Sequence, residues 1–268
     1  MALAQREKLP PGEVHFYTDY NNGSDTNSGS ITSPWRTAIG AASILHDQYD
    51  FTFAGQQTRA VINMADNTTD MDGFHYSPHG LLGSGGGAAM AIRGGTNSKI
   101  YSEGSAAVGV YYTGVIKLEN VKLSAPNGNG IDAIRAGEVQ INNVEFENCA
   151  GACVNIDGFG RVFQNGAIGI SGPVQYFLTG NCGRYQSFGH AININANLNM
   201  NCFAYIGGNG QFSFQSGGNR SPINMNGHSV TGKRFIVDNY GVCDTGGGGA
   251  NYFPGNQAGT ATPRGNYG

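Results

Sequence analysis

Glu145 and Glu147 are the residues of this chain whose types and spacing best fit catalysis. They lie two residues apart in an alternating run, so both side chains are expected on one outward face of a strand. Glycoside hydrolysis uses two carboxylates about 5–9.5 Å apart, one of them as an acid. The alternative is a solvated strand face on which Glu145 pairs with Lys122. We favour this alternative, because the short repeats of this region leave little room for a deep active-site groove.

A second candidate site follows from four residues that are close in sequence: Arg184, Tyr185, Phe188 and His190. Aromatic rings offer flat apolar faces on which a sugar can stack, and arginine and histidine can hydrogen-bond its hydroxyl groups. The cluster therefore predicts a glycan-binding site. The same residues are also compatible with core and corner positions of a repetitive fold.

Neither a metal ion nor a cofactor is expected. Asp19, Asp25 and Asn27 resemble calcium ligands, but their spacing differs from that of an EF-hand loop and indicates ordinary turns. No pair of the five cysteines has the CxxC spacing of a zinc site, and an odd count favours buried free thiols over a disulfide framework.

An internal repeat of 23 residues defines the fold. The segment 116–123 (IKLENVKL) aligns with 139–146 (VQINNVEF), so that Ile116 matches Val139 and Leu118 matches Ile141. Repeats of this length indicate solenoids, and alternating runs broken by glycine and asparagine indicate strands. The sequence therefore predicts an all-β solenoid of parallel strands, with one coil per repeat and like residues stacked on like.

The stacking makes specific contacts predictable. The inward residues are Ile116, Leu118, Val121 and Leu123, and the outward residues are Lys117, Glu119 and Lys122. Asn120 is expected to lie over Asn143 in a hydrogen-bonded ladder. Lys122 is expected over Glu145, where an ion pair would contribute about 0–1 kcal/mol.

Both ends of the chain differ from the repeats. Ser33 as N-cap and Pro34 as the first residue predict a helix that covers the open end of the first coil. The glycine-rich tail has aromatic residues but no coil pattern, so it is expected to pack on a neighbouring subunit. The expected regions are an N-terminal arm for attachment to a larger assembly (1–13), the entry strand with the capping helix and first coils (14–98), the parallel β-helix (99–243) and the tail (244–268).

Composition excludes some functions. The formal net charge of −3 argues against a nucleic-acid partner, and no apolar run is long enough to insert into a membrane. Met1 to Leu9 has no apolar core of the kind found in secretory signals, so synthesis in the cytoplasm without export by the standard route is expected.

Two parts of the chain resemble a known family. Residues 16–29 (FYTDYNNGSDTNSG) and 33–37 (SPWRT) resemble the opening of pectate-lyase-like parallel β-helix proteins, and residues 247–260 (GGGANYFPGNQAGT) are similar to tails of bacteriophage fibre proteins. The resemblance, over about 50 residues, is to bacteriophage tail spike and tail fibre proteins. It implies a right-handed, single-stranded parallel β-helix in a homotrimer that projects from the virion.

The expected function is accordingly that of a structural virion protein, a trimeric β-helical shaft for attachment to the host surface. Its partners would be two further copies, tail or baseplate proteins bound through the arm, and a host surface polysaccharide. One alternative is a polysaccharide depolymerase, either a lyase or a glycoside hydrolase. A second alternative is a fibre that decorates the capsid head.

Overall fold

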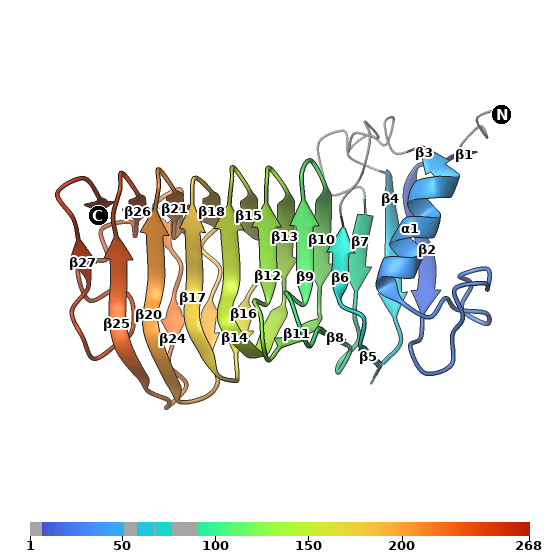
Figure 1. Ribbon diagram of the computed structural model, residues 1–268, viewed down its shortest axis with the longest axis horizontal. Coiled ribbons are helices and arrows are strands. Elements are labelled where there is room, and N and C mark those ends of the chain that lie inside the picture. The colour runs from blue at the N-terminus through green and yellow to red at the C-terminus, as the bar shows by residue number, and fades with distance from the viewer. Residues whose placement is uncertain (1–6, 51–57, 67, 77–89) are drawn as a thin grey trace.

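A computed structural model describes residues 7–50, 58–66, 68–76 and 90–268. Residues 1–6 of the proposed attachment arm lie outside the described residues. The described chain is mostly β, and its strands are stacked side by side along the long axis of the molecule (Figure 1). Each central coil gives one strand to a first long parallel sheet and its remaining strands to a second one, which is compatible with a parallel β-helix.

The first long sheet has one strand from each coil, all of them parallel. Its strands among the described residues are, in stacking order, β2 (Gly12–Thr18), β4 (Thr58–Met64), β7 (Met90–Arg93), β10 (Val115–Glu119), β13 (Glu138–Asn142), β15 (Arg161–Gln164), β18 (Arg184–Ser187), β21 (Gln211–Ser213), β26 (Val242–Asp244) and β28 (Asn266–Tyr267). This sheet is called the ten-stranded sheet below.

The second long sheet has two arms that share the bent strand β14 (Val144–Asp157). One arm contains β5 (Thr69–Asp70), β8 (Lys99–Tyr101), β11 (Lys122–Ala125), β16 (Ile168–Ile170), β19 (Ile192–Ile194) and β24 (Ile223–Asn224). The other contains β6 (Phe74–Tyr76), β9 (Val108–Tyr111), β12 (Ile131–Ile134), β17 (Val174–Asn181), β20 (Leu198–Gly207), β25 (Val230–Val237) and β27 (Thr260–Ala261). Two short pairs lie outside these sheets: β1 (Glu7–Lys8) with β3 (Tyr49–Asp50), and β22 (Gln215–Ser216) with β23 (Asn219–Arg220).

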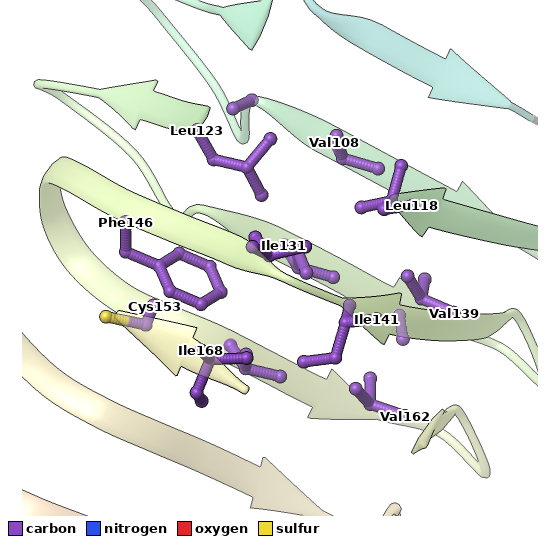
Figure 2. Packing of buried hydrophobic residues seen from close by; sticks show 14 of the residues in the cluster. Val108, Leu118, Leu123, Ile131, Val139, Ile141, Phe146, Cys153, Val162 and Ile168 are labelled. Atoms are coloured by element: carbon purple, nitrogen blue, oxygen red, sulfur yellow. The ribbon is translucent and has the colours of Figure 1, made fainter. Parts of the chain in front are cut away.

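The 23-residue register predicted from the sequence is confirmed. Ile116 pairs with Val139, Lys122 with Glu145 and Ile131 with Val154. The four residues expected to face inward, Ile116, Leu118, Val121 and Leu123, are all buried. Side chains from neighbouring coils stack in the interior, as Leu123 and Phe146 do (Figure 2). The repeat therefore places the apolar residues of one coil directly on those of the next.

The predicted asparagine ladder is also present. Asn143 Nδ2 donates a hydrogen bond to Asn120 Oδ1 at 3.2 Å. Both residues are in the left-handed region, each with a φ of 55°. Asparagine tolerates this conformation better than most residues, so the pair both turns the chain at this corner and connects two coils.

The helix α1 (Ala38–Gln48) lies at the N-terminal end of the molecule and contacts β2, β4 and β6 (Figure 1). Its N-cap is Thr37, whose hydroxyl accepts a hydrogen bond from the backbone N–H of Gly40, so the prediction of Ser33 as N-cap is wrong. Buried Asp70 accepts another hydrogen bond from the N–H of Ala38 at 2.7 Å. The helix begins at Ala38, four residues after the predicted first residue Pro34, because these two acceptors meet its free N–H groups there.

The tail packs on its own chain, whereas the sequence predicts packing on a neighbouring subunit. Its short strands β27 and β28 extend both long sheets. Phe253 is fully buried, and the ring of Tyr267 stacks on Phe235 with 3.7 Å between centroids. The tail therefore covers the last full coil from within the chain.

Candidate functional site

Glu147 is held by two lysines. Its carboxylate contacts Nζ of Lys99, and its Oε1 lies 3.5 Å from Nζ of Lys122. The predicted ion pair between Lys122 and Glu145 is therefore replaced, although these two residues lie opposite each other in the register. The reason is a register shift between Leu123 and Ser124, where the facing strand has one extra residue, Glu147. Glu147 serves as an ion-pair partner.

The side chain of Glu145 points along the stack of coils in the direction opposite to that of Glu147. Its neighbour in the next coil is Gly169, which has no side chain, and the Glu145 carboxylate occupies the space that a β-carbon there would need. Both carboxylate oxygens lie 3.3 Å from Nδ2 of Asn195, two coils away. Glu145 and Glu147 therefore have separate partners, and each is bound to groups other than its fellow carboxylate.

Glu145 lines a surface groove of about 520 Å³ at the corner marked by the asparagine ladder. Apolar residues of the corner alternate in the groove with polar ones. The polar lining residues are Thr96, Asn120, Lys122, Asn143, Glu145 and Asn193. Such a surface can hydrogen-bond an extended polar ligand. Glu145 is the single carboxylate among its lining residues, so the groove fits binding better than two-carboxylate hydrolysis.

Glu119 departs from its expected exposure. It lies under two cations on the outer face of the ten-stranded sheet, with 6 % of its surface exposed. Arg93 Nη2 lies 2.8 Å from its carboxylate, and Lys117 also contacts it. Although burial alone would raise the pKa of Glu119, hydrogen bonds from Lys117 and Arg93 outweigh burial and lower the pKa. Glu119 is therefore a structural ion-pair residue.

The predicted glycan-binding cluster divides in the structure. Tyr185 is fully buried, and its hydroxyl donates a 2.6 Å hydrogen bond to Gln164 Oε1. Its register partners, Val162 and Phe212, are core residues of the neighbouring coils. Tyr185 cannot reach a ligand, so its predicted role in glycan binding is wrong. Arg184, the adjacent residue, points to the opposite face and is exposed.

Phe188 is exposed on the same side of the molecule as Arg184, with 42 % of its surface accessible. Its ring stacks on Phe163 with 6.2 Å between centroids and 27° between planes. Gln186 lies between Arg184 and Phe188 in the sequence and accepts a 3.1 Å hydrogen bond from Arg184. We call Phe163, Arg184, Gln186 and Phe188 the aromatic–arginine face. His190 is partly exposed, and its backbone carbonyl accepts a hydrogen bond from Gln164.

A further exposed residue, Phe159, borders this region and was not among the predicted site residues. It is 75 % exposed and has a φ of 69°, a conformation that is rare for a phenylalanine. Phe159 lines a depression of about 410 Å³ together with Arg161, Arg184, Asn209 and Gln211. Phe159 follows Gly158 and takes the position that Ala136 has in the earlier repeat. This match is the signal in the sequence that indicates a corner position.

Metal-binding clusters of three or more histidine, cysteine or acidic residues are absent from the described part of the chain. Asp19 and Asp25 accept backbone hydrogen bonds in the loop before the helix, from Asn21 and from Arg36 respectively, as turn residues do. The five cysteines are free thiols, and all except Cys182 are buried. No helix in residues 7–50, 58–66, 68–76 and 90–268 is long and apolar enough to cross a membrane.

The chain matches no protein-family model, and neither a curated protein nor a solved structure matches it.

Proposed function

We propose that this chain is a structural protein of a bacteriophage virion, of the tail fibre or tail spike type, that attaches to the host surface. In this proposal the long parallel sheets form a right-handed, single-stranded β-helix, with α1 and the tail closing its two ends. Three copies lie side by side as a shaft, and the N-terminal arm binds other tail or baseplate proteins. The sequence resemblance of residues 16–37 and 247–260 supports the assignment to phage.

The observation that carries attachment is the aromatic–arginine face. Exposed stacked rings beside an arginine and an amide are suited to a sugar, because the rings cover its apolar face while Arg184 and Gln186 hydrogen-bond its hydroxyl groups. The face lies on a rigid sheet, which positions these groups without loss of backbone freedom. Host surface polysaccharide is the ligand that this arrangement fits.

The test is binding of the full chain to surface polysaccharide purified from the bacterium on which the particle grows. Phe188→Ala should weaken binding about tenfold, because loss of one stacked ring costs about 1–1.5 kcal/mol. Tyr240→Ala, which removes an exposed ring that is not part of the aromatic–arginine face, is the matched control and should bind like the wild type. Equal binding by all three proteins would contradict the proposed face.

Three further measurements test the rest of the proposal. Light scattering should give the mass of three chains, and antibodies against the chain should label the tail of intact particles. Label on the head would favour the decoration fibre instead. Incubation with the polysaccharide should release no reducing ends or unsaturated sugars, and their release would favour the depolymerase.

A further inference from the structure

Arg161 and Arg184 form a like-charge pair on neighbouring coils. They are direct register partners in the ten-stranded sheet, where adjacent strands lie about 4.8 Å apart. Like charges placed opposite each other on a sheet destabilise it. The pair is therefore an unfavourable contact for folding unless an anion lies beside both arginines, as Glu147 lies beside another like-charge register pair, Lys99 and Lys122.

The surrounding residues neutralise only half of this charge. Arg161 contacts Glu138 Oε2 at 3.3 Å, and its side chain remains 49 % exposed. The hydrogen-bond partner of Arg184 is the neutral amide of Gln186. Among the described residues no carboxylate forms an ion pair with Arg184, and Asp244, farther along the face, is bound by Gln215 and by Ser213. One positive charge is left at this surface.

The pair lies in a depression shaped for a ligand. Both arginines line the depression of about 410 Å³, with Asn209 and Gln211 on its far side. Phe159 stands at its edge, 75 % exposed. Its left-handed conformation recurs at the equivalent corners of neighbouring coils, at Ala136 and Cys182, so the turn of the repeat is what holds this ring at the surface. Charge, amides and an exposed ring thus converge at one place.

We propose that Arg161 and Arg184 bind a carboxylate or phosphate group carried by a saccharide. The anion relieves the repulsion between the guanidinium groups, each of which presents N–H donors in a geometry that matches two oxygens. Phe159 contacts the sugar ring, and Asn209 and Gln211 bind its hydroxyl groups. The inference rests on the proposed attachment function and specifies its ligand as an acidic glycan.

Four small probes test the site on the full chain: glucose, glucuronate, glucose 6-phosphate and inorganic phosphate. Calorimetry or ligand-observed NMR should show at least one acidic sugar binding about tenfold or more tightly than glucose, because hydrogen bonds to charged groups are the stronger ones. Arg184→Gln and Arg161→Gln should each remove that advantage. Arg36→Gln removes an exposed arginine that lies two residues before α1, outside the ten-stranded sheet, and should retain it.

The two acidic sugars distinguish carboxylate from phosphate as the recognised group. Binding of glucose as tight as that of both acidic sugars, or an unchanged preference in Arg184→Gln, would overturn the proposal. Inorganic phosphate that binds as tightly as glucose 6-phosphate would overturn the saccharide part. If the probes bind as expected but particle adsorption is indifferent to this chain, the site stands and the attachment function fails.

Discussion

Phe253 provides the most direct test of how the tail is held. It is fully buried, although it lies in a glycine-rich segment near the end of the chain. Its ring stacks on Phe203 with 5.4 Å between centroids and meets Phe214 edge-on at 4.8 Å. It also lies 4.8 Å from the ring of Tyr252. These rings belong to the last coils and to the tail, so Phe253 joins the two.

Phe253→Ala should therefore destabilise the C-terminal coils. A phenylalanine truncated in a core costs about 3–5 kcal/mol, and the loss of aromatic pairs belongs to the same range. In a solenoid each coil contacts only its neighbours, so the effect should be confined to the end of the molecule. Because about 1.4 kcal/mol is a factor of ten, hydrogen exchange in β25 to β28 should accelerate about 100-fold or more.

Hydrogen exchange followed by mass spectrometry measures this change coil by coil. Protection of β10 to β14 should stay at the wild-type level and serves as the internal standard. Phe159→Ala is the matched control, because it truncates the same residue type at an exposed corner and should change stability by less than about 0.5 kcal/mol. Exchange in β25 to β28 that is equally slow in Phe253→Ala and wild type would refute the packing of the tail on its own chain.

The remaining predictions concern the ladder and the helix. Asn143→Ala should lower the free energy of unfolding by about 1–2 kcal/mol, because the variant loses the hydrogen bond to Asn120 and places alanine in a left-handed conformation that asparagine tolerates better. Asn143→Gly should lower it less, because glycine adopts this conformation readily. Chemical denaturation compares the two variants. Burial raises the pKa of Asp70 from 3.8 to about 6, although the hydrogen bonds that its carboxylate accepts act to lower the pKa. The folded state therefore holds this proton more tightly, so the stability that the protonated group contributes is lost as the pH rises through about 6. Asp70→Asn should gain stability relative to the wild type between pH 4 and pH 7, and a difference that is flat across this range would exclude the raised pKa.

The central coils were the most predictable part of the molecule. A repeat of 23 residues fixes the register, and alternation within each strand then fixes which side chains point inward. The same two rules also identify Tyr185 as a core residue, because it lies 23 positions after the buried Val162. The predicted role of Tyr185 in glycan binding is wrong because it rests on closeness in sequence to Arg184, Phe188 and His190 and not on the position of Tyr185 in the repeat.

Local departures from the repeat were beyond prediction. The extra residue Glu147 shifts the register from 23 to 24 at Ser124, and the offset returns to 23 by Ile131. This bulge decides which glutamate Lys122 contacts. The start of α1 was missed for a similar reason: Asp70, distant in sequence, supplies an acceptor to the first helical N–H, and only the fold brings it there.

The burial of the tail could not be predicted from the sequence, because it depends on how the aromatic rings of the tail fit against the last coils. Glycine-rich sequence shows no alternation, yet Tyr267 stacks on Phe235, and Phe253 enters the space next to Phe203. Without a periodic pattern, a buried aromatic residue cannot be distinguished from an exposed one in the sequence. Because these rings are buried within one chain, the tail gives no separate argument for a trimer, and the proposed trimer rests on the resemblance to phage fibres.

Stacked coils also give a general means of finding a site in this protein. The favourable column is a ladder of like amides, as in Asn193 with Asn224 or Asn195 with Asn226. Arg161 beside Arg184 has the same register but the opposite energetic sign, because two guanidinium groups repel where two amides bond. Glu147 offsets the repulsion between the stacked Lys99 and Lys122, whereas Arg184 has no carboxylate of the described chain in an ion pair, so a ligand of opposite charge would supply what is missing there. The face around Arg184 is therefore where we expect the chain to meet its ligand.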